Sequence, residues 1–402
     1  MDKLFFPWLQ THWSLRQDLL AGLIVSILII PQAIGYGLLA QLPAASALAC
    51  CIFPLLAYAL FGNGRSLAIG PVAIVSMMVG DALLNVPLAD KVAGAQLLAL
   101  QVALVLLAMR LLRLGTLVHF IGHPVIHGFT AAAAILIIIK QLPLLLGVSL
   151  ISGQSPHMAT TSLALLALLV LIITAKLKHP TFSKLGPLLA ILMGIFASLA
   201  WPEVSWNQVP IDPQQPAILL NTILPWHLFS QLFPSALLIA LIGFLESTSV
   251  IKSLGHQQAP TGQNGIKPNQ ELMGLWAANL AAAVFQAFPV AGGFGRSMVN
   301  HKAGATSPMA GVFTACFVLI FLLFAREMIA FIPLAILGAI VLMAVWPLLD
   351  IKPILKDWSV LPNDKIAWLT TFTAVLIFGA EVGIGAGVVA SLFFLIRSAS
   401  HP

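Results

Sequence analysis

Apolar residues run along this chain in long blocks that short polar stretches separate. Most blocks approach the roughly 20 residues that a helix needs to cross a bilayer. Fourteen blocks can be assigned, seven on each side of a polar stretch with five prolines between residues 202 and 225. They cover residues 19–40, 47–61, 67–84, 92–109, 118–139, 158–175 and 185–200, and then 233–250, 272–285, 288–303, 309–325, 332–349, 366–380 and 382–396. The pattern predicts an all-α membrane protein with 14 transmembrane segments.

The third block of each half is unlike the others because glycine and proline interrupt it. Both interrupted blocks contain the same tripeptide, Pro71-Val72-Ala73 and Pro289-Val290-Ala291. An odd number of spans in each half inverts the second half relative to the first, which is the layout of inverted-repeat transporters. We therefore expect a single transport domain over 1–402, with repeat one at about 15–200 and repeat two at about 231–397. The third and tenth segments should be half-helices that meet at the membrane midplane.

Composition and charge support this layout. Hydrophobic residues make up 60% of the chain and charged residues 8%, far below the roughly 25% charged residues of soluble domains. With the amino terminus inside, fifteen of the 19 Lys and Arg residues fall inside, and Lys91, Lys140 and Arg326 outside. That asymmetry is typical of inner-membrane proteins and places both termini in the cytoplasm. One long tilted helix over 366–396 would instead move the carboxyl terminus outside.

Several classes of function are excluded by what the chain does not contain. It has no basic run and no aromatic ladder for nucleic-acid bases. Cys50, Cys51 and Cys316 lack metal-ligand spacing and read as small buried hydrophobes. No nucleophile–base pair or metal set is present, so we expect neither an enzyme nor a bound cofactor.

Two charges lie where lipid or protein should surround them. Glu246 follows an apolar run over 236–245, and Arg296 follows an uncharged run over 272–295. Intramembrane ionisable residues are costly and are usually functional. The alternative is that these two residues pair with each other and only hold the helices together.

The interrupted blocks predict an anion site. Proline and glycine should start a helix near mid-depth, where its unpaired backbone N–H groups and dipole attract an anion. Two such starts beside Arg296 would form a positively polarised pocket; the alternative is that the glycines only permit close helix packing. The candidate substrate-binding residues at these starts are Val72, Ala73, Ala291, Gly292, Gly293, Phe294, Gly295 and Arg296.

Coupling and substrate contacts are assigned to two further segments. A buried carboxyl at Glu246 can take a proton when the anion arrives, or it can help to hold Na⁺ beside Ser247, Thr248 and Ser249. The candidate coupling residues are Glu246, Thr248 and Ser249. Gln32 and Tyr36 lie one turn apart on a helix broken at Pro31, and we interpret them as a wall of the pocket. A packing role for Gln32 is the alternative.

Several motifs together resemble the SulP (sulfate permease) family. They are PQAIGYGLLAQLP at 31–43, FGNGRSLAIGPVAIVSMMVG at 61–80, LGTLVHFIGHPVIHGFTAAAA at 114–134, GFLESTSVIKSL at 243–254, NQELMGLWAANL at 269–280 and FPVAGGFGRSMVNHKAGATSPMAG at 288–311. The resemblance covers nearly the whole chain in order.

The resemblance implies seven-plus-seven inverted repeats divided into a core, 15–118 with 231–326, and a gate, 119–230 with 327–397. The anion would lie between the third and tenth segments, and an elevator motion of the core would carry it across. Glu246 matches an acid that bacterial members associate with proton coupling, and Arg296 matches a basic residue at the start of the tenth helix.

Two departures from the family pattern stand out. The tenth segment of members reads close to P-V-T-G-S-F-S-R, and three hydroxyls are here replaced by Ala291, Gly293 and Gly295. A site without these hydroxyls should desolvate a dianion such as sulfate less well. Members also carry a cytoplasmic STAS domain, which we do not expect in this chain because it ends at Pro402.

These inferences predict a transporter of a small anion of the sulfate, bicarbonate or dicarboxylate class in the bacterial cytoplasmic (inner) membrane. Proton-coupled symport is the leading hypothesis. A Na⁺-coupled bicarbonate symporter, an anion exchanger or channel, and a carrier of uncharged substrates are the alternatives. The expected partners are the anion and the lipid bilayer, with a homodimer left open.

Overall fold

The computed structural model describes residues 5–10, 13–115, 123–148, 156–177, 185–210, 224–258, 268–349 and 362–379, together with separate residues between 382 and 393. They belong to two compact units. The first comprises Met1–Gly115 and Pro143–Val341, and the second comprises Thr116–Leu142 and Leu342–Pro402. Helices dominate both units, in agreement with the predicted class of fold.

The helices follow the apolar blocks closely. Those of the first unit are η1 (Pro7–Gln10), α1 (Leu15–Leu39), α2 (Ala44–Ala49), α3 (Phe53–Phe61), α4 (Ala73–Ala82), η2 (Leu88–Asp90), α5 (Lys91–Leu111), α7 (Met158–Lys176), α8 (Gly186–Ala200), η5 (Trp226–Leu228), α9 (Phe229–Gln258), α10 (Pro268–Val284), α11 (Phe294–Lys302), α12 (Met309–Phe324) and η6 (Arg326–Phe331). The second unit contains η7 (Trp346–Leu349) and α15 (Pro362–Phe378), while α6 (His123–Leu146) and α13 (Leu334–Val345) contribute to both.

Six described segments are long and apolar enough to cross a membrane. They are Leu15–Leu39, Ala44–Phe61, Leu88–Leu111, Pro124–Leu146, Met158–Lys176 and Trp226–Leu254. Shorter apolar helices, α8, α12 and the segment Leu334–Leu349 among them, add to these. A multi-pass helical membrane protein is therefore confirmed. The count of fourteen spans, the inverted repeats and the division into core and gate stay predictions, and most of the last block, 382–396, lies outside the described residues.

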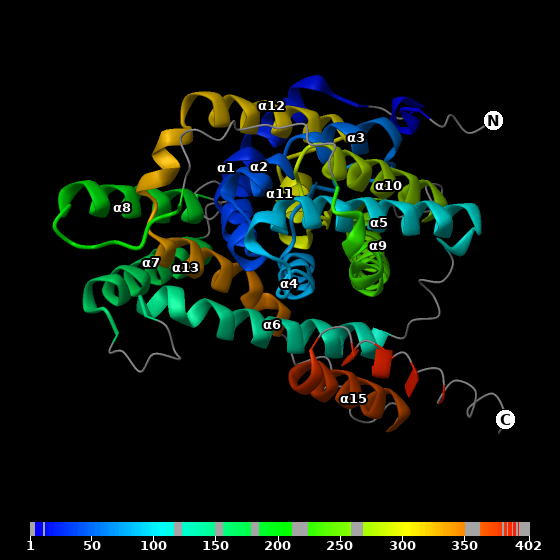
Figure 1. Ribbon diagram of the computed structural model, residues 1–402. Helices are drawn as coiled ribbons and strands as arrows, with labels where there is room; N and C mark the ends of the chain where they lie inside the picture. Colours follow the sequence, from blue (N-terminus) through cyan, green and yellow to red (C-terminus); the bar gives the residue numbers. More distant parts are fainter. Residues whose placement is uncertain are drawn as a thin grey trace. The chain divides into compact units, whose positions relative to one another are not determined.

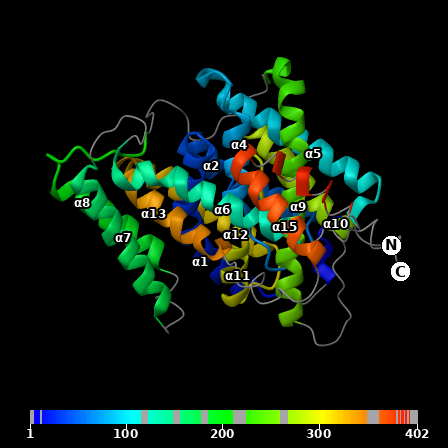
Figure 2. The same ribbon diagram turned by 90° about the horizontal axis from the view of Figure 1, so that it is seen from below.

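Within the first unit, the helices pack into a bundle around α1 and α9. Helix α1 packs along α12, α10 lies against both α3 and α5, and α5 also contacts α9. The two views agree that the short helices α4 and α11 lie between α1 and α9 (Figure 1, Figure 2). The interrupted blocks are therefore at the centre of this unit.

A buried carboxylate fixes α1 against the start of α12. Asp18 is fully buried and accepts hydrogen bonds from the backbone N–H of Thr306 and the hydroxyl of Ser307, both at 2.6 Å. One turn further, Gly22 lets the two helices approach, and the Thr314 hydroxyl donates to its carbonyl at 3.3 Å. This joint sets the position of α1, which carries Gln32 and Tyr36.

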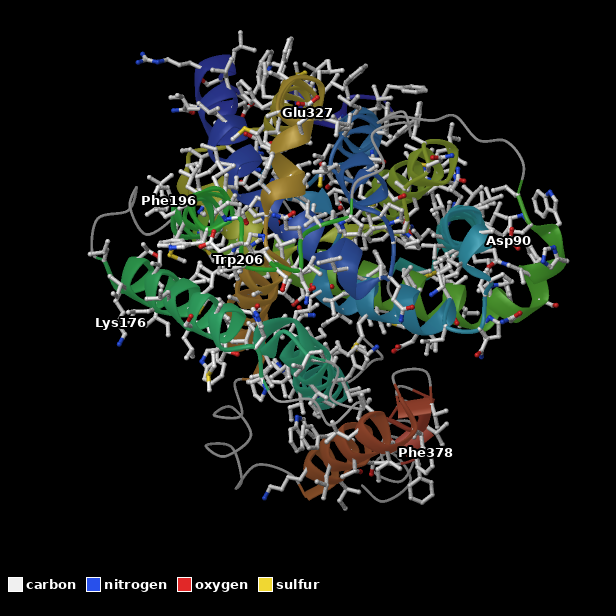
Figure 3. All side chains as sticks on the ribbon, turned by 60° about the vertical axis from the view of Figure 1, so that its left-hand side comes forward. Asp90, Lys176, Phe196, Trp206, Glu327 and Phe378 are labelled. Carbon is white, nitrogen blue, oxygen red and sulfur yellow. The ribbon has the colours of Figure 1, made fainter. Side chains whose placement is uncertain are left out.

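The outer surface of the first unit separates charged from apolar side chains. Asp90, Lys176 and Glu327 lie at the ends of elements (Figure 3). Phe196, in the middle of α8, is 65% exposed. Charges at the ends and bare apolar side chains between them suit helices whose outer faces meet lipid.

Candidate anion-binding site

The two interrupted blocks meet through a pair of very short strands. Strand β1 (Ile69–Gly70) pairs antiparallel with β2 (Ala291–Gly292), with Ile69 opposite Gly292 and Gly70 opposite Ala291. Each strand runs directly into a helix, β1 into α4 and β2 into α11. At 10 and 9 residues, these helices measure roughly 15 Å and 14 Å, about half a bilayer. The pairing thus brings both helix starts together, while their place at the membrane midplane stays a prediction.

Hydrogen bonds between the two interrupted blocks stabilise this geometry. The backbone N–H of Gly293 donates to the carbonyl of Ala68 at 3.2 Å. The N–H of Ala68 in turn donates to the hydroxyl of Ser297, in the first turn of α11, at 2.9 Å. Val72 and Gly293 both adopt extended backbone as the helices begin. The first N–H groups of α4 and α11 are therefore available at the same place.

The strand β2 is also fixed by polar side chains from two neighbouring helices. Asn279 of α10 accepts from the N–H of Val290 at 3.0 Å and donates to its carbonyl at 3.1 Å. Ser247 of α9 accepts from the N–H of Gly292 at 2.9 Å. Cys50 makes weaker contacts with the N–H and carbonyl of Phe288 at 3.4 Å and 3.5 Å. Backbone that has left the helix is thereby satisfied inside the protein, as a membrane interior requires.

Asn279→Leu should destabilise the protein, because it leaves both backbone groups of Val290 buried without the amide. Each such group costs about 1–3 kcal/mol. We expect a lower thermal unfolding midpoint of the purified protein in detergent. Thr174→Val is the matched control, since within the described part of the chain the Thr174 hydroxyl bonds only to carbonyls of its own helix, α7. Equal midpoints for the two variants would contradict the clamp role of Asn279.

Arg296 lies at the centre of the paired helix starts. The residue is 4% exposed, and its Nη1 donates to the carbonyl of Pro71 at 2.7 Å. Its Nε and Nη2 are buried and have no hydrogen-bond partner among the described residues. These two nitrogens share one edge of the guanidinium, the edge that binds two oxygens of an oxyanion side by side. Arg296 thus has one edge tied to the protein and the other uncommitted.

Glycines surround the uncommitted edge. A Cβ atom at Gly293 would lie 3.0 Å from Nη2 of Arg296, and one at Gly70 would lie 3.2 Å from it. At Gly295 a Cβ would meet no described atom within 4 Å, and Gly295 and Phe294 are exposed. A side chain at 293 would therefore press on the guanidinium, whereas a Cβ at 295 would point into open space.

A methyl group at 293 should consequently weaken anion binding more than one at 295. Gly293→Ala pushes the uncommitted edge of Arg296 out of place, and we expect at least about a tenfold rise in the apparent KM for anion uptake, the loss of roughly one charge-assisted hydrogen bond. Gly295→Ala should show the smaller rise. Uptake kinetics of both variants in proteoliposomes provide the comparison, and a larger effect at 295 would show that the anion does not use this edge.

Glu246 and Tyr36 complete the site from α9 and α1. The field of Arg296 acts on both residues, and the charge of Glu246 also acts on Tyr36. Oε2 of Glu246 is buried and makes no hydrogen bond with any described residue. Tyr36 and Glu246 therefore lie close enough to Arg296 for its charge to act on both. Gln32, one turn before Tyr36, is half-buried.

The other predicted coupling residues occupy different surroundings. The hydroxyl of Thr248 is buried and donates to carbonyls of its own helix, those of Phe244 and Leu245. Ser249 is exposed. Among α9 hydroxyls, the one joined to the paired strands is that of Ser247. The sequence did not single out Asn279 and Ser297. For Asn279, its position as an asparagine within an apolar block was a usable signal.

Metal binding was considered from sequence only as Na⁺ near Glu246. No group of three or more His, Cys, Asp or Glu side chains that could hold a metal ion occurs in the described part of the chain.

The described residues thus form bilayer-length helices around two helix starts and a buried arginine that has nitrogens without a described partner, an architecture typical of membrane transporters. The model of the sulfate permease family matches residues 15–371. The chain belongs to this family, which confirms the resemblance seen in its motifs.

Known relatives and solved structures agree with this assignment. The chain is 34% identical over 436 residues to the chloroplastic sulfate transporter 4.1 of Arabidopsis thaliana, an alignment that covers 100% of this chain and 62% of the relative. Its fold is similar to that of SLC26A9, with a TM-score of 0.90, 18% identity, and coverage of 98% of this chain and 68% of that one. The transmembrane domain of the cyanobacterial bicarbonate transporter BicA gives a TM-score of 0.77, 20% identity, and coverage of 95% and 98%. The family and these relatives are transporters, not enzymes.

Proposed function

We propose that the chain is a secondary active transporter that binds a small anion at the paired starts of α4 and α11. The observation that carries the proposal is Arg296, a buried cation with two nitrogens that lack partners in the described structure. A buried charge without a partner is strongly unfavourable. An anion on the Nε–Nη2 edge, near the first N–H groups of both helices, would supply the missing partner.

The substrate class that fits is an oxyanion of the sulfate, bicarbonate or dicarboxylate type. The names of relatives include sulfate and bicarbonate transporters. The uncommitted guanidinium edge suits anions that present two oxygens. Replacement of the family's hydroxyls by Ala291, Gly293 and Gly295 leaves fewer donors for a dianion, which favours a singly charged oxyanion.

Transport would be driven by protons through Glu246. Its carboxyl is close enough to sense Arg296 electrostatically, and one oxygen has no partner among described residues. An anion that arrives at Arg296 competes for the same positive charge, so proton uptake by Glu246 would accompany anion binding. We place the movement in an elevator-type displacement of the core against the gate, in a bacterial inner membrane with both termini cytoplasmic.

A Na⁺-coupled bicarbonate symporter is the second candidate. It is favoured by the likeness to the BicA domain and by the half-buried Glu246, which is followed on α9 by the buried hydroxyl residues Ser247 and Thr248. In this version Glu246 remains charged and helps to hold the cation.

Uptake into proteoliposomes tests the proposal. Labelled sulfate and bicarbonate are offered with an excess of sulfate, bicarbonate, chloride, nitrate or fumarate as competitor. Saturable uptake that an oxyanion suppresses supports the assignment. Uptake no faster than in empty liposomes for every anion, by protein that is folded, would refute it.

A further inference from the structure

The hydroxyl of Ser247 joins two segments of the site that are far apart in the sequence, α9 and β2. It is fully buried, donates to the carbonyl of Gly243 at 2.6 Å and accepts from the N–H of Gly292 at 2.9 Å. A serine hydroxyl has one hydrogen, so the bond to Gly243 fixes its orientation and leaves a lone pair for Gly292. The link between α9 and β2 is thus directional and specific.

The two residues joined by this hydrogen bond each lie close in sequence to one of the two charges of the site, Glu246 and Arg296. Ser247 follows Glu246 directly on α9, and Gly292 lies two residues before Phe294, at which α11 begins. The same stretch of α9 is in close contact with β2, because a Cβ at Gly243 would lie 3.3 Å from that of Ala291. A shift of this turn of α9 would therefore move β2 and the start of the helix that carries Arg296.

The charged groups around Glu246 leave Arg296 as its main electrostatic neighbour. Helix α9 itself carries Lys252. The elements packed against α9 contribute Asp81 on α4, Lys91 and Arg110 in the end turns of α5, His227 on η5, Glu271 in the first turn of α10, and Arg296 with His301 and Lys302 on α11. Of these, Arg296 is the described charge that acts on Glu246. Protonation of Glu246 removes its attraction to Arg296 and so changes the force between α9 and α11.

We propose that Ser247 is a positioning residue that makes the anion site respond to the charge of Glu246. Its hydrogen bond to Gly292 transmits the displacement of α9 to β2, and from there to the start of α11 and the guanidinium of Arg296. The inference rests on the proposed function, because it requires that Glu246 couples protons to anion binding.

The readout that separates coupling from simple stability is the pH dependence of anion affinity. If proton and anion binding are linked, the anion affinity differs between about pH 5.5 and pH 8. The ratio of the two affinities, called the pH ratio, measures the linkage, which typically amounts to about 5- to 150-fold. Affinity is followed as the concentration for half-maximal counterflow of labelled sulfate, or of labelled nitrate if sulfate is not taken up. Neither anion changes its own charge over this pH range.

Ser247→Ala should reduce this ratio to below about threefold while counterflow itself persists. Ser253→Ala is the matched control on α9, since among the described residues the Ser253 hydroxyl donates to Val250 of the same helix, and it should keep the wild-type ratio. Glu246→Gln should remove the pH dependence, so that the ratio of the two affinities falls to about one. Adding Ser247→Ala to that variant should not change the ratio further. Ser247→Cys, which keeps a weaker donor and acceptor, should give an intermediate ratio.

The outcomes are distinguishable. A wild-type ratio in Ser247→Ala, or the same loss in Ser253→Ala, overturns the role of Ser247 and leaves the proposed function intact. If Ser247→Ala fails to fold, Ser247→Cys decides, and a wild-type ratio there overturns the inference. A wild-type protein with no pH-dependent affinity refutes proton coupling at Glu246 and the inference with it.

Discussion

Arg296→Ala should weaken anion binding by about 10- to 100-fold. The variant removes the buried guanidinium whose Nε and Nη2 lack partners among described residues, and a hydrogen bond to a charged group contributes about 1.5–3 kcal/mol. Arg296→Lys keeps the charge but replaces the planar edge by a single ammonium. It should retain part of the affinity and should lose most for anions that present two oxygens.

The measurement is the apparent KM for oxyanion uptake in proteoliposomes, with folding checked by size-exclusion chromatography. The competing hypothesis is that Arg296 and Glu246 only stabilise the bundle. Under that hypothesis Arg296→Ala lowers the unfolding temperature but leaves the KM of the folded fraction unchanged. Such a result would show that the anion does not bind at Arg296.

Glu246→Gln should keep anion binding and abolish accumulation driven by a proton gradient. Glutamine preserves the shape of the side chain but cannot gain or lose a proton. Each pH unit of gradient corresponds to about 1.36 kcal/mol per proton, which supports up to about tenfold accumulation for one proton per anion at zero membrane potential. With the outside one unit more acidic, we expect net accumulation by the wild type and simple equilibration by the variant.

The coupling ion is identified by varying pH and Na⁺ independently at fixed anion concentration. Proton coupling predicts that accumulation follows the pH difference and ignores Na⁺. Accumulation that follows Na⁺ alone would instead favour the Na⁺-coupled bicarbonate symporter. Undiminished proton-driven accumulation in Glu246→Gln would exclude Glu246 as the coupling group.

The sequence predicted the helical membrane class and a site at the interrupted blocks from local signals; the class is confirmed, whereas the site stays a prediction. Long apolar blocks identify bilayer-length helices without reference to tertiary contacts. Glycine and proline before Val72 and before Arg296 identify the two helix starts, since these residues end regular backbone. Two charges in otherwise uncharged segments predict where function lies, and in the structure Glu246 lies within electrostatic reach of Arg296.

The tertiary contacts that assemble the site could not be predicted from local sequence patterns. The pairing of Ile69 with Gly292 joins residues more than 200 positions apart, and no single-sequence pattern specifies that register. Helix α9 is apolar on several sides, so its sequence does not show which hydroxyl faces β2. Ser247 and Ser249 project about 200° apart on a helix, and only the packed structure distinguishes the bonded serine from the exposed one.

Block boundaries shifted for similar reasons. The second block divides into α2 and α3 around Cys50, whose thiol contacts Phe288. Helix α9 extends to Gln258, beyond the predicted end at 250. Tertiary packing and polar helix ends decide such limits, whereas hydropathy reports only the apolar part.

The most direct test of the central claim is whether an anion occupies the space beside Arg296. Gly295→Cys places a thiol where a Cβ meets no described atom within 4 Å, in a Cys316→Ser background that leaves only the buried Cys50 and Cys51. The labelling rate of this thiol by a small methanethiosulfonate is measured with and without saturating sulfate, bicarbonate or nitrate. Anions that compete for uptake should slow the labelling in the order of their affinities. An unchanged labelling rate at concentrations that saturate uptake by the same variant would contradict it.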